Sequence, residues 1–248
     1  MTLIPQEGYR ALPALNASYL KHVLTHSKWH ADLPVSPTPA MLLGTLIHSK
    51  ILEPEKDDEF AVFEGDRRTK AGKELYAELQ QSGKMIVTRD QMDTALSTAA
   101  AIAAHPKLAE YLERSVLREQ SMTFELGGHD CKAQVDLYSE GGVLIDLKTT
   151  ADVHKAERQF FNMNYALQMW WYREALRRNG YDVHRCAMIF VETSAPYQCA
   201  FYEIGGDILR HGEGLARLAL DRWVEQSAQP TPALIEERLT LPGWLKGD

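Results

Sequence analysis

Two aspartates and a lysine are the residues of this sequence with the clearest chemical potential. Asp146 and Lys148 interrupt an otherwise apolar run, LIDLKT, and Asp136 precedes Asp146 by ten positions. Charged side chains among apolar residues cost free energy unless they are paired or bind a ligand. Carboxylates are typical ligands of Mg²⁺, which polarises a phosphate and activates a bound water, while a neighbouring amine can orient or deprotonate that water or neutralise developing charge. The spacing alone leaves two interpretations open: a metal-dependent site that cleaves phosphodiesters, or a surface hairpin with an Asp–Lys pair.

A β-hairpin is expected to position these residues. β-rich runs flank two consecutive glycines, which is typical of a hairpin turn. Because side chains alternate along a strand, Asp146 and Lys148 share one face, whereas Ile145 and Leu147 point the other way, into the core. The carbonyl oxygen of Leu147, between the two charged residues, is a further candidate metal ligand.

The length of the hairpin loop decides where Asp136 lies. A three-residue loop, 140–142, pairs Ser139 with Val143 and sets Asp136 opposite Asp146, whereas a two-residue loop places Asp136 on the wrong face. We predict the three-residue loop, whose last glycine supplies the left-handed conformation. Two carboxylates and one ammonium then lie close together.

The chain as a whole is predicted to be an α/β protein. Its pattern changes from helical to β near Ser115, and three strands, a helix, two strands and a last helix follow. We expect one domain of 248 residues, with a mainly helical part at about 1–110 and a sheet-containing core at about 115–226. Expected elements outside the hairpin are helices over Ala17–His26 (capped by Ser18), over Ala40–Glu53, from Thr88 onward, over Ala156–Arg178 (amphipathic, ended by Asn179 and Gly180) and over Asp207–Gln226, a strand over Phe60–Phe63 and a basic loop over Arg67–Lys73.

Composition and charge exclude several classes of protein. The formal net charge is −7, so binding of a polyanion has to come from local clusters of Lys and Arg. The three cysteines share no CxxC spacing, which speaks against a disulfide framework, a zinc ribbon or an iron–sulfur cluster and favours a reducing compartment. The N-terminal segment has no secretory pattern, and no run of 18 apolar residues occurs, so we expect neither export nor a membrane span.

The motifs, taken in order, resemble a known nuclease family. Asp136, Asp146 and Lys148 match the PD-(D/E)XK nuclease motif, and Gln168 and Tyr172 match the QxxxY motif of its RecB-like branch. The segments LGTLIHSKILEPE, RRTKAGKELY, AAHPKLAEYL and VLIDLKTTADVHKAERQFFNMNYALQMWWYREAL resemble the C-terminal nuclease domain of exonuclease VIII (RecE-type). The resemblance covers about residues 16–178.

This resemblance implies a fold, an activity and a set of partners. The fold is the PD-(D/E)XK core, a mixed β-sheet flanked by helices, with a helical N-terminal part. The activity is that of a 5′→3′ exonuclease on ends of double-stranded DNA, encoded by a phage or prophage and acting in the cytoplasm of the bacterial host. The partners are a single-strand annealing protein and further copies of the chain in a trimeric or tetrameric ring.

The resemblance also assigns roles to residues. Mg²⁺, or Mn²⁺ in its place, is held by His48, Glu119, Asp136 and Asp146, and Lys148 assists the attack of water. The family often has a basic residue and a proline directly before the first aspartate, and this chain departs from that pattern with Gln134 and Val135. The departure puts substrate contacts near Gln134 in doubt, but not the binding of metal.

Three of these positions also have a structural interpretation. A lone histidine on an apolar helix, such as His48, is usually a core residue, and the resemblance is what favours a metal ligand. Gln168 and Tyr172 share a helix face with Tyr165, which fits an aromatic core face. The functional alternative has the Gln168 amide and the Tyr172 phenol hold a DNA phosphate or the site lysine, and a buried glutamine does need partners.

Two sets of basic or imidazole side chains remain to be interpreted. Runs of Lys and Arg are usually solvated, yet in an acidic chain they can also grip backbone phosphates without sequence preference. His22 and His26, spaced four residues apart, are expected to be a solvated helix face rather than a zinc site. The candidate phosphate-binding residues are Arg67, Arg68, Lys70 and Lys73.

Two rival functions stay open. One is another nuclease of the same fold, such as an endonuclease or a repair nuclease of different polarity. The other is a DNA-end-binding module without catalysis, against which the intact Asp136, Asp146 and Lys148 argue.

Overall fold

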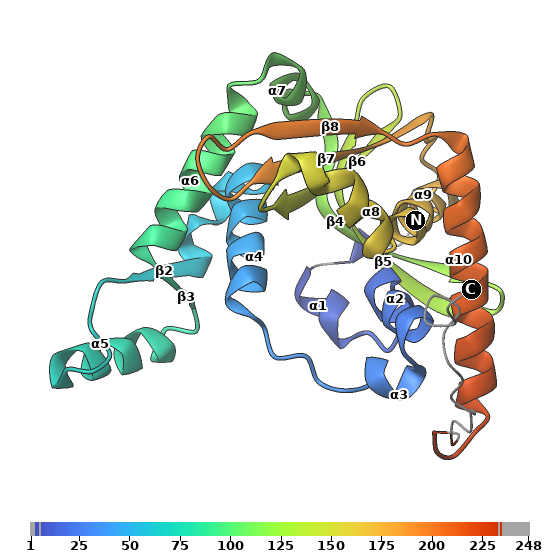
Figure 1. Cartoon of the computed structure of the whole chain (residues 1–248), viewed down its shortest axis with the longest axis horizontal. Helices are drawn as coiled ribbons and strands as arrows, with labels where there is room; N and C mark the ends of the chain where they lie inside the picture. Colours follow the sequence, from blue (N-terminus) through green and yellow to red (C-terminus); the bar gives the residue numbers. More distant parts are fainter. Residues whose placement is uncertain (1–2, 5, 233, 235–248) are drawn as a thin grey trace, which may run out of the picture.

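A six-stranded mixed β-sheet forms the centre of the protein in a computed structural model, which describes residues 3–4, 6–232 and 234. The fold class is α/β, as the sequence predicts, and helices lie on both sides of the sheet (Figure 1). One pair of neighbouring strands in this sheet is parallel, and all other neighbouring strands are antiparallel. In spatial order the strands are β1 (Leu3–Ile4), β4 (Ser115–Leu126), β5 (His129–Ser139), β6 (Val143–Thr150), β7 (Arg185–Glu192) and β8 (Cys199–Glu203), with β6 and β7 the parallel pair.

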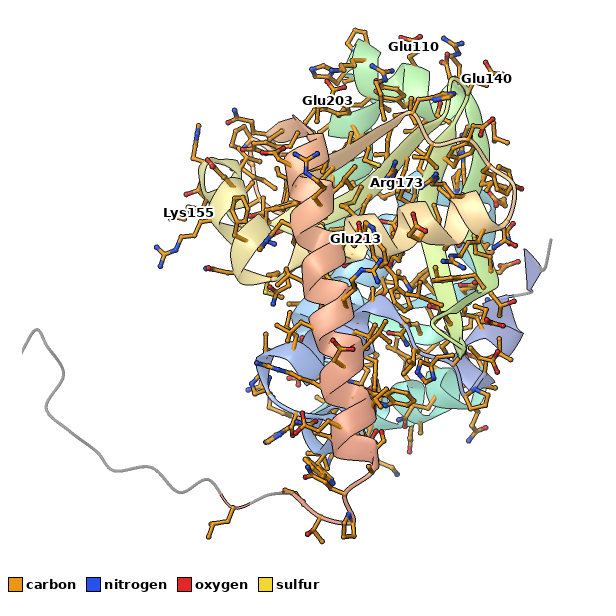
Figure 2. All side chains as sticks on the ribbon, turned by 90° about the vertical axis from the view of Figure 1, so that its right-hand side faces the viewer. Glu110, Glu140, Lys155, Arg173, Glu203 and Glu213 are labelled. Carbon is orange, nitrogen blue, oxygen red and sulfur yellow. The ribbon has the colours of Figure 1, made fainter. Side chains whose placement is uncertain are left out.

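Two apolar clusters fill the space between the sheet and the helices. One contains Leu144 of β6, and the other contains Ile145 and Leu147 of the same strand, so successive side chains enter opposite cores. In Figure 2, α10 crosses α9 on the side that faces the viewer, with Glu213 on α10 and Arg173 on α9. The first core is covered by α2 (Ala17–Thr25), α9 (Tyr165–Arg178) and α10 (Gly206–Ser227), and the second by α4 (Pro39–Leu52), α6 (Arg89–Ala103) and α7 (Pro106–Glu113).

A smaller unit projects from the side of this sandwich (Figure 1). Its two short strands pair in parallel, and α5 packs against them. We call residues 60–88 the arm: β2 (Phe60–Phe63), α5 (Lys70–Gln81) and β3 (Met85–Thr88). The remaining described elements are α1 (Gln6–Ala11), α3 (Lys28–Ala31), α8 (Ala156–Asn162) and two 3-10 helices, Pro54–Glu59 and Val153–Lys155.

The hairpin of β5 and β6 has the predicted register. Ser139 pairs with Val143, Tyr138 with Leu144, and the loop between them has three residues. Both glycines of the loop adopt positive φ, 75° at Gly141 and 71° at Gly142, where one left-handed residue was predicted. The three-residue loop is therefore confirmed, and the paired ladder ends at Leu137 and Ile145.

Several predicted boundaries are wrong for local reasons. The cap of α2 is Asn16, whose side chain accepts the backbone N–H of Tyr19, so Ser18 lies inside the first turn. The expected basic loop ends at Thr69, which caps α5, so Lys70 and Lys73 are helical.

The helix expected over 156–178 is two helices, α8 and α9. Asn164 breaks it with a φ of 50°, in the left-handed region. Consecutive residues 165–171 of α9 are all buried, so this part of the helix is not amphipathic. The predicted end at Asn179 and Gly180 is confirmed.

Other segments follow the sequence more closely. Thr88 caps α6 in a capping box with Gln91, and β2 has its predicted bounds, Phe60–Phe63. The partner strand β3 was not expected, because a four-residue apolar run carries little signal by itself. None of the described helices is long and apolar enough to cross a membrane. The division into domains stays a prediction.

Candidate functional site

Three side chains from three elements form the one group of potential metal ligands among the described residues. His48 comes from α4, Glu119 from β4 and Asp136 from β5, and one ligand atom of each lies within 4.8 Å of the others. His48 Nδ1 is 3.1 Å from Glu119 Oε1 and 3.9 Å from Asp136 Oδ2. The group opens into a cavity of about 290 Å³, lined by Gly44, Thr45, His48, Ser49, Glu53, Glu59, Phe60, Glu119, Gln134, Asp136 and Tyr172.

Glu119 reaches this group through an irregularity in β4. Its φ is 42°, in the left-handed region that non-glycine residues rarely adopt. The neighbours Arg118 and Gln120 pair with Leu137 and Val135, whereas Glu119 has no ladder partner. The strained backbone thus turns the carboxylate of Glu119 toward α4. Strain of this kind persists only where the surrounding structure holds it.

Gln134 is part of the site, which the sequence did not predict. Its Nε2 donates to Glu119 Oε2 at 2.7 Å, while Glu119 Oε1 faces His48. The departure from the family pattern at this position therefore places an amide where it fixes a candidate ligand. The available sequence signal was its place two residues before Asp136, on the same strand.

Asp146 and Lys148 form an adjoining pair. The Lys148 Nζ atom is 2.5 Å from Asp146 Oδ2, and Asp146 is fully buried. Asp146 Oδ1 accepts a hydrogen bond from Gln168 Nε2 at 2.7 Å, whereas Oδ2 has the ion pair but no contact with hydrogen-bond geometry. Asp146 lies outside the group of His48, Glu119 and Asp136, so its predicted role as a ligand stays a prediction.

The two groups are joined by the backbone of β6. Asp136 Oδ2 accepts the N–H of Leu147 at 2.8 Å, and the Leu147 carbonyl accepts a hydrogen bond from Lys148 Nζ at 3.3 Å. The candidate site is therefore one continuous cluster over α4, β4, β5 and β6. Leu147 as a metal ligand stays a prediction.

Burial and mutual charge shift the pKa values in this cluster. Burial raises the pKa of Asp136 and of Asp146, although the Lys148 ammonium opposes the rise. For Lys148, burial lowers the pKa, but the two carboxylates outweigh burial and raise it above the ordinary value. For His48, burial likewise lowers the pKa, and Asp136 and Glu119 raise it overall. Such perturbed groups gathered in a cleft are typical of functional sites.

Gln168 and Tyr172 are both at the site, and their contacts differ in part from the prediction. Gln168 is buried, and its Nε2 also contacts the Tyr172 hydroxyl at 3.2 Å. The described hydrogen bonds of Gln168 go to Asp146, Tyr172 and Lys21, and not to Lys148. The amide therefore holds the carboxylate of the site rather than its lysine.

Lys21 of α2 is a second lysine at the site that sequence reasoning missed. Its Nζ donates to Gln168 Oε1 at 2.7 Å and lies 4.9 Å from the centre of the Tyr165 ring. Burial, with the Lys148 charge as a second cause, lowers the pKa of Lys21 to about 8. The available sequence signal was its place four residues after the apolar Ala17 in a predicted helix, because residues at this spacing share a helix face.

The four basic residues predicted to bind DNA lie on the arm. The Arg67 guanidinium stacks on the Tyr76 ring at 3.6 Å, and Arg68 is paired with Asp66 at 2.9 Å. Lys70 and Lys73 are exposed in the first turn of α5. None of the four lines the cavity at His48, so their role in binding DNA stays a prediction.

The imidazoles of His22, His26 and His30 do not form a metal group within the described residues. The rings of His22 and His26 stack with their centres 6.2 Å apart, and His30 adds a third ring at 5.6 Å from His26. All three are exposed, in line with the solvated helix face expected for the first two.

The donors at His48, Glu119 and Asp136 fit a divalent cation. Two carboxylates and an imidazole are common ligands of such ions, and the fold holds them together although the two carboxylates repel each other. Asp146, whose carboxylate is already paired with Lys148 and Gln168, adjoins this group without belonging to it. The site is therefore a candidate divalent-metal site.

The chain belongs to the family of PDDEXK-like domains of unknown function (DUF3799). The family model matches residues 15–227, which is most of the chain. This confirms the predicted PD-(D/E)XK nuclease fold. A search of the curated proteins gives no match.

A search of the solved structures finds several similar chains. A protein from Eubacterium rectale to which exonuclease activity is attributed has a TM-score of 0.69 and 16% identity, with 98% of each chain covered. A phage-related exonuclease from Haemophilus somnus 129PT has a TM-score of 0.38 and 15% identity, over 87% of this chain and 95% of its own. LHK-Exo in complex with dAMP has a TM-score of 0.42 and 12% identity, over 90% and 94%. The likeness to the protein from Eubacterium rectale, at a TM-score of 0.69, shows the fold.

Proposed function

We propose that the protein is a divalent-metal-dependent exonuclease that hydrolyses phosphodiesters at the ends of double-stranded DNA in the 5′→3′ direction. The observation that carries the proposal is the cluster in which His48, Glu119 and Asp136 adjoin the buried Asp146–Lys148 ion pair. Mg²⁺ is the proposed ion and Mn²⁺ its substitute, since carboxylate-rich sites suit hard cations.

The residues of the chain have separate tasks in this proposal. Glu119, Asp136 and His48 hold the cation, with Asp146 as a further ligand. When bound, a divalent cation polarises the phosphate and lowers the pKa of a water. Lys148 is an ammonium next to these groups, and it donates hydrogen bonds that orient a nucleophile and neutralise charge that develops on the phosphate.

Supporting residues keep these groups in place. Gln134 holds Glu119, and Gln168 holds Asp146, each through a hydrogen bond of 2.7 Å. Orientation of this kind lowers the barrier because the reacting groups need no rearrangement. Two exposed lysines of the arm, Lys70 and Lys73, are proposed to contact backbone phosphates outside the cavity.

The resemblance to exonuclease VIII supports a wider setting for this activity. It includes a ring of three or four copies, a single-strand annealing protein as partner, and a role in phage-type recombination in the bacterial cytoplasm. Mass photometry of the purified chain at nanomolar concentration tests the ring. A monomer under these conditions would remove that part of the proposal.

Digestion of linear duplexes labelled at either end tests the proposed activity. With Mg²⁺ we expect mononucleotides to be released first from the 5′-labelled end, and with EDTA no release. Covalently closed circles serve as the matched substrate without ends, and cleavage of these circles would show an endonuclease instead. Asp146→Ala should abolish release while DNA binding persists. Binding without release by the unaltered protein would identify a DNA-end-binding module.

A further inference from the structure

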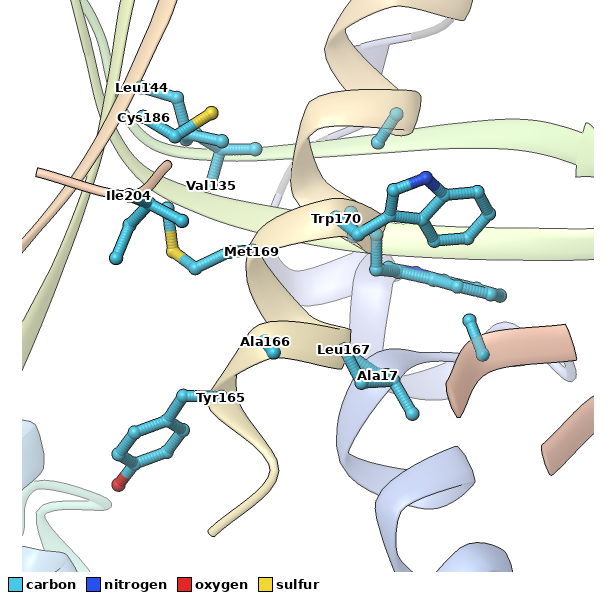
Figure 3. Packing of buried hydrophobic residues seen from close by; sticks show 14 of the residues in the cluster. Ala17, Val135, Leu144, Tyr165, Ala166, Leu167, Met169, Trp170, Cys186 and Ile204 are labelled. Carbon is cyan, nitrogen blue, oxygen red and sulfur yellow. The ribbon is translucent and has the colours of Figure 1, made fainter. Parts of the chain in front are cut away.

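Lys21 and Gln168 lie 147 positions apart in the chain and meet beside Asp146. Lys21 Nζ donates to Gln168 Oε1, and Gln168 Nε2 donates to Asp146 Oδ1, both at 2.7 Å. Packing of α2 on α9 brings them together, because Ala17 of α2 and Leu167 of α9 belong to one apolar core (Figure 3). The contact is thus built by the fold and does not depend on a flexible surface side chain.

The chemistry of the two neighbours fixes the orientation of the Gln168 amide. An ammonium has only donors and a carboxylate has only acceptors, so Lys21 requires the amide oxygen and Asp146 requires the amide nitrogen. A flipped amide would place its nitrogen against the Lys21 ammonium and its oxygen against the Asp146 carboxylate. Without Lys21, only Asp146 would require one particular orientation of the Gln168 amide. The Tyr172 hydroxyl can donate or accept a hydrogen bond, so it does not distinguish the two orientations.

We propose that Lys21 is a positioning residue of the candidate active site: it locks the Gln168 amide, so that Gln168 holds Asp146 Oδ1 and leaves Oδ2 for Lys148 and the reaction. The inference rests on the proposed function, because it assigns a task within that reaction. It adds a residue of α2 to a site whose predicted residues lie on the sheet, on α4 and on α9.

A purely structural role does not explain why a lysine stands at this position. Lys21 and Lys148 flank the same Tyr165 ring, at 4.9 Å and 5.3 Å from its centre, so their like charges oppose each other. Lys132 shows what a structural buried lysine does in this fold, since its ammonium donates to the backbone carbonyls of Tyr9 and Leu12 and ties down the N-terminal segment. The Lys21 ammonium instead donates its hydrogen bond to the side chain of Gln168, which is part of the site.

A double-mutant cycle tests whether Lys21 acts through Gln168. Lys21→Met removes the donor at similar length, and we expect kcat to fall about tenfold, which corresponds to about 1.4 kcal/mol, with KM changed less than about twofold. Gln168→Met and the double variant should have the same kcat, because Lys21 has nothing left to position once the amide is gone. Lys132→Met is the matched control, with lower thermal stability but normal kcat.

Other kinetic outcomes would overturn the inference. Additive losses in the double variant would show that Lys21 acts independently of Gln168. A rise in KM at constant kcat would identify a direct contact with DNA, and unchanged kinetics would leave Lys21 without a role in the reaction.

A second readout does not require activity. In protein labelled with ¹⁵N-glutamine, the side-chain amide of Gln168 is assigned by its absence in Gln168→Met. We expect its hydrogen exchange to be at least about tenfold faster in Lys21→Met than in the wild type and in Lys132→Met. Equal exchange in all three would overturn the inference. If the wild type has no nuclease activity, the proposed function fails, and the amide measurement still decides whether Lys21 locks Gln168.

Discussion

The carboxylate of Asp136 accepts the backbone N–H of Leu147 at 2.8 Å, at the point where β5 and β6 stop pairing. The ladder of the hairpin ends at Leu137 and Ile145, and a side-chain oxygen of Asp136 replaces the next backbone acceptor. Val135 and Leu137 lie in opposite cores, although residues two apart in a regular strand share a face. The strand alternation therefore shifts at Asp136, and this shift frees its carboxylate for the cavity.

Asp136→Asn is expected to stabilise the metal-free protein near pH 7. Burial raises the folded-state pKa of Asp136 despite Lys148 and His48, so the folded protein binds this proton more tightly than the unfolded chain. The protonated Asp136 carboxyl therefore stabilises the folded protein fully below the pKa that Asp136 has in the unfolded chain. This stabilisation is lost as the pH rises through the pKa of Asp136 in the folded protein. An asparagine removes the cost of the buried charge and still accepts the Leu147 N–H. In EDTA, the Tm of Asp136→Asn should exceed that of the wild type by about 3 °C for each kcal/mol gained in the free energy of unfolding.

Lowering the pH and adding metal are the controls for this prediction. The advantage of Asp136→Asn should shrink as pH is lowered toward 4, because the wild-type carboxyl then becomes neutral as well. With saturating Mg²⁺ or Mn²⁺ the order should reverse, since a ligand at 100 times its Kd adds about 2.7 kcal/mol to the wild type. Equal stabilisation of both proteins by metal would contradict a cation site at Asp136.

Replacement of Glu119 by glycine and by alanine separates backbone strain from chemistry. Both variants lose the carboxylate that contacts His48 and Gln134, so both should lose nuclease activity. Glycine adopts the φ of 42° freely, whereas alanine keeps the strain, which costs about 1–2 kcal/mol. We expect Glu119→Gly to be the more stable variant in urea unfolding by about 1 kcal/mol. The opposite order, which is usual within strands, would argue against strain at this position.

The two glycines of the hairpin loop should differ in their tolerance of alanine. Both have positive φ, but a Cβ at Gly142 would lie 2.6 Å from the Asp182 carbonyl oxygen, whereas a Cβ at Gly141 meets nothing within 4 Å. Gly141→Ala should cost about 1 kcal/mol of unfolding free energy from the conformation alone. Gly142→Ala should cost clearly more, and it should also lower kcat because the hairpin carries Asp136 and Asp146. Similar costs at both positions would contradict the described loop.

The lysines of the arm should contribute to DNA affinity without sequence preference. Lys73→Ala is expected to weaken duplex binding uniformly and to reduce the slope of log K against log salt by about 1, as for the loss of one phosphate contact. Lys107→Ala is the matched control, since this lysine stacks on Phe201 at 3.8 Å, away from the arm. Fluorescence anisotropy at several salt concentrations measures the slope. An unchanged slope for Lys73→Ala would show that the arm lysine is merely solvated.

Local rules gave the hairpin and the motif from the sequence. The alternation of side chains and the three-residue loop fix the faces of Asp146 and Lys148, because strand period and turn chemistry are properties of neighbouring residues. Capping works over the same short range, which is why Thr88 was found as the start of α6. The prediction of Ser18 as the cap of α2 was wrong, because Asn16, two positions earlier, also has a side-chain oxygen that can accept a backbone N–H.

The tertiary structure alone decided which groups gather around the site. The contact of Lys21 with Gln168, the hydrogen bond from Gln134 to Glu119 and the left-handed backbone of Glu119 depend on how helices and strands distant in sequence pack together. The spacing of residues in the sequence does not predict such contacts. The helices and strands that carry them are held together by apolar surface buried between distant elements, and not by interactions of adjacent residues. The sequence thus determined the kind of chemistry and the strands that carry it, and the packing of α2, α4 and α9 against those strands determined its geometry.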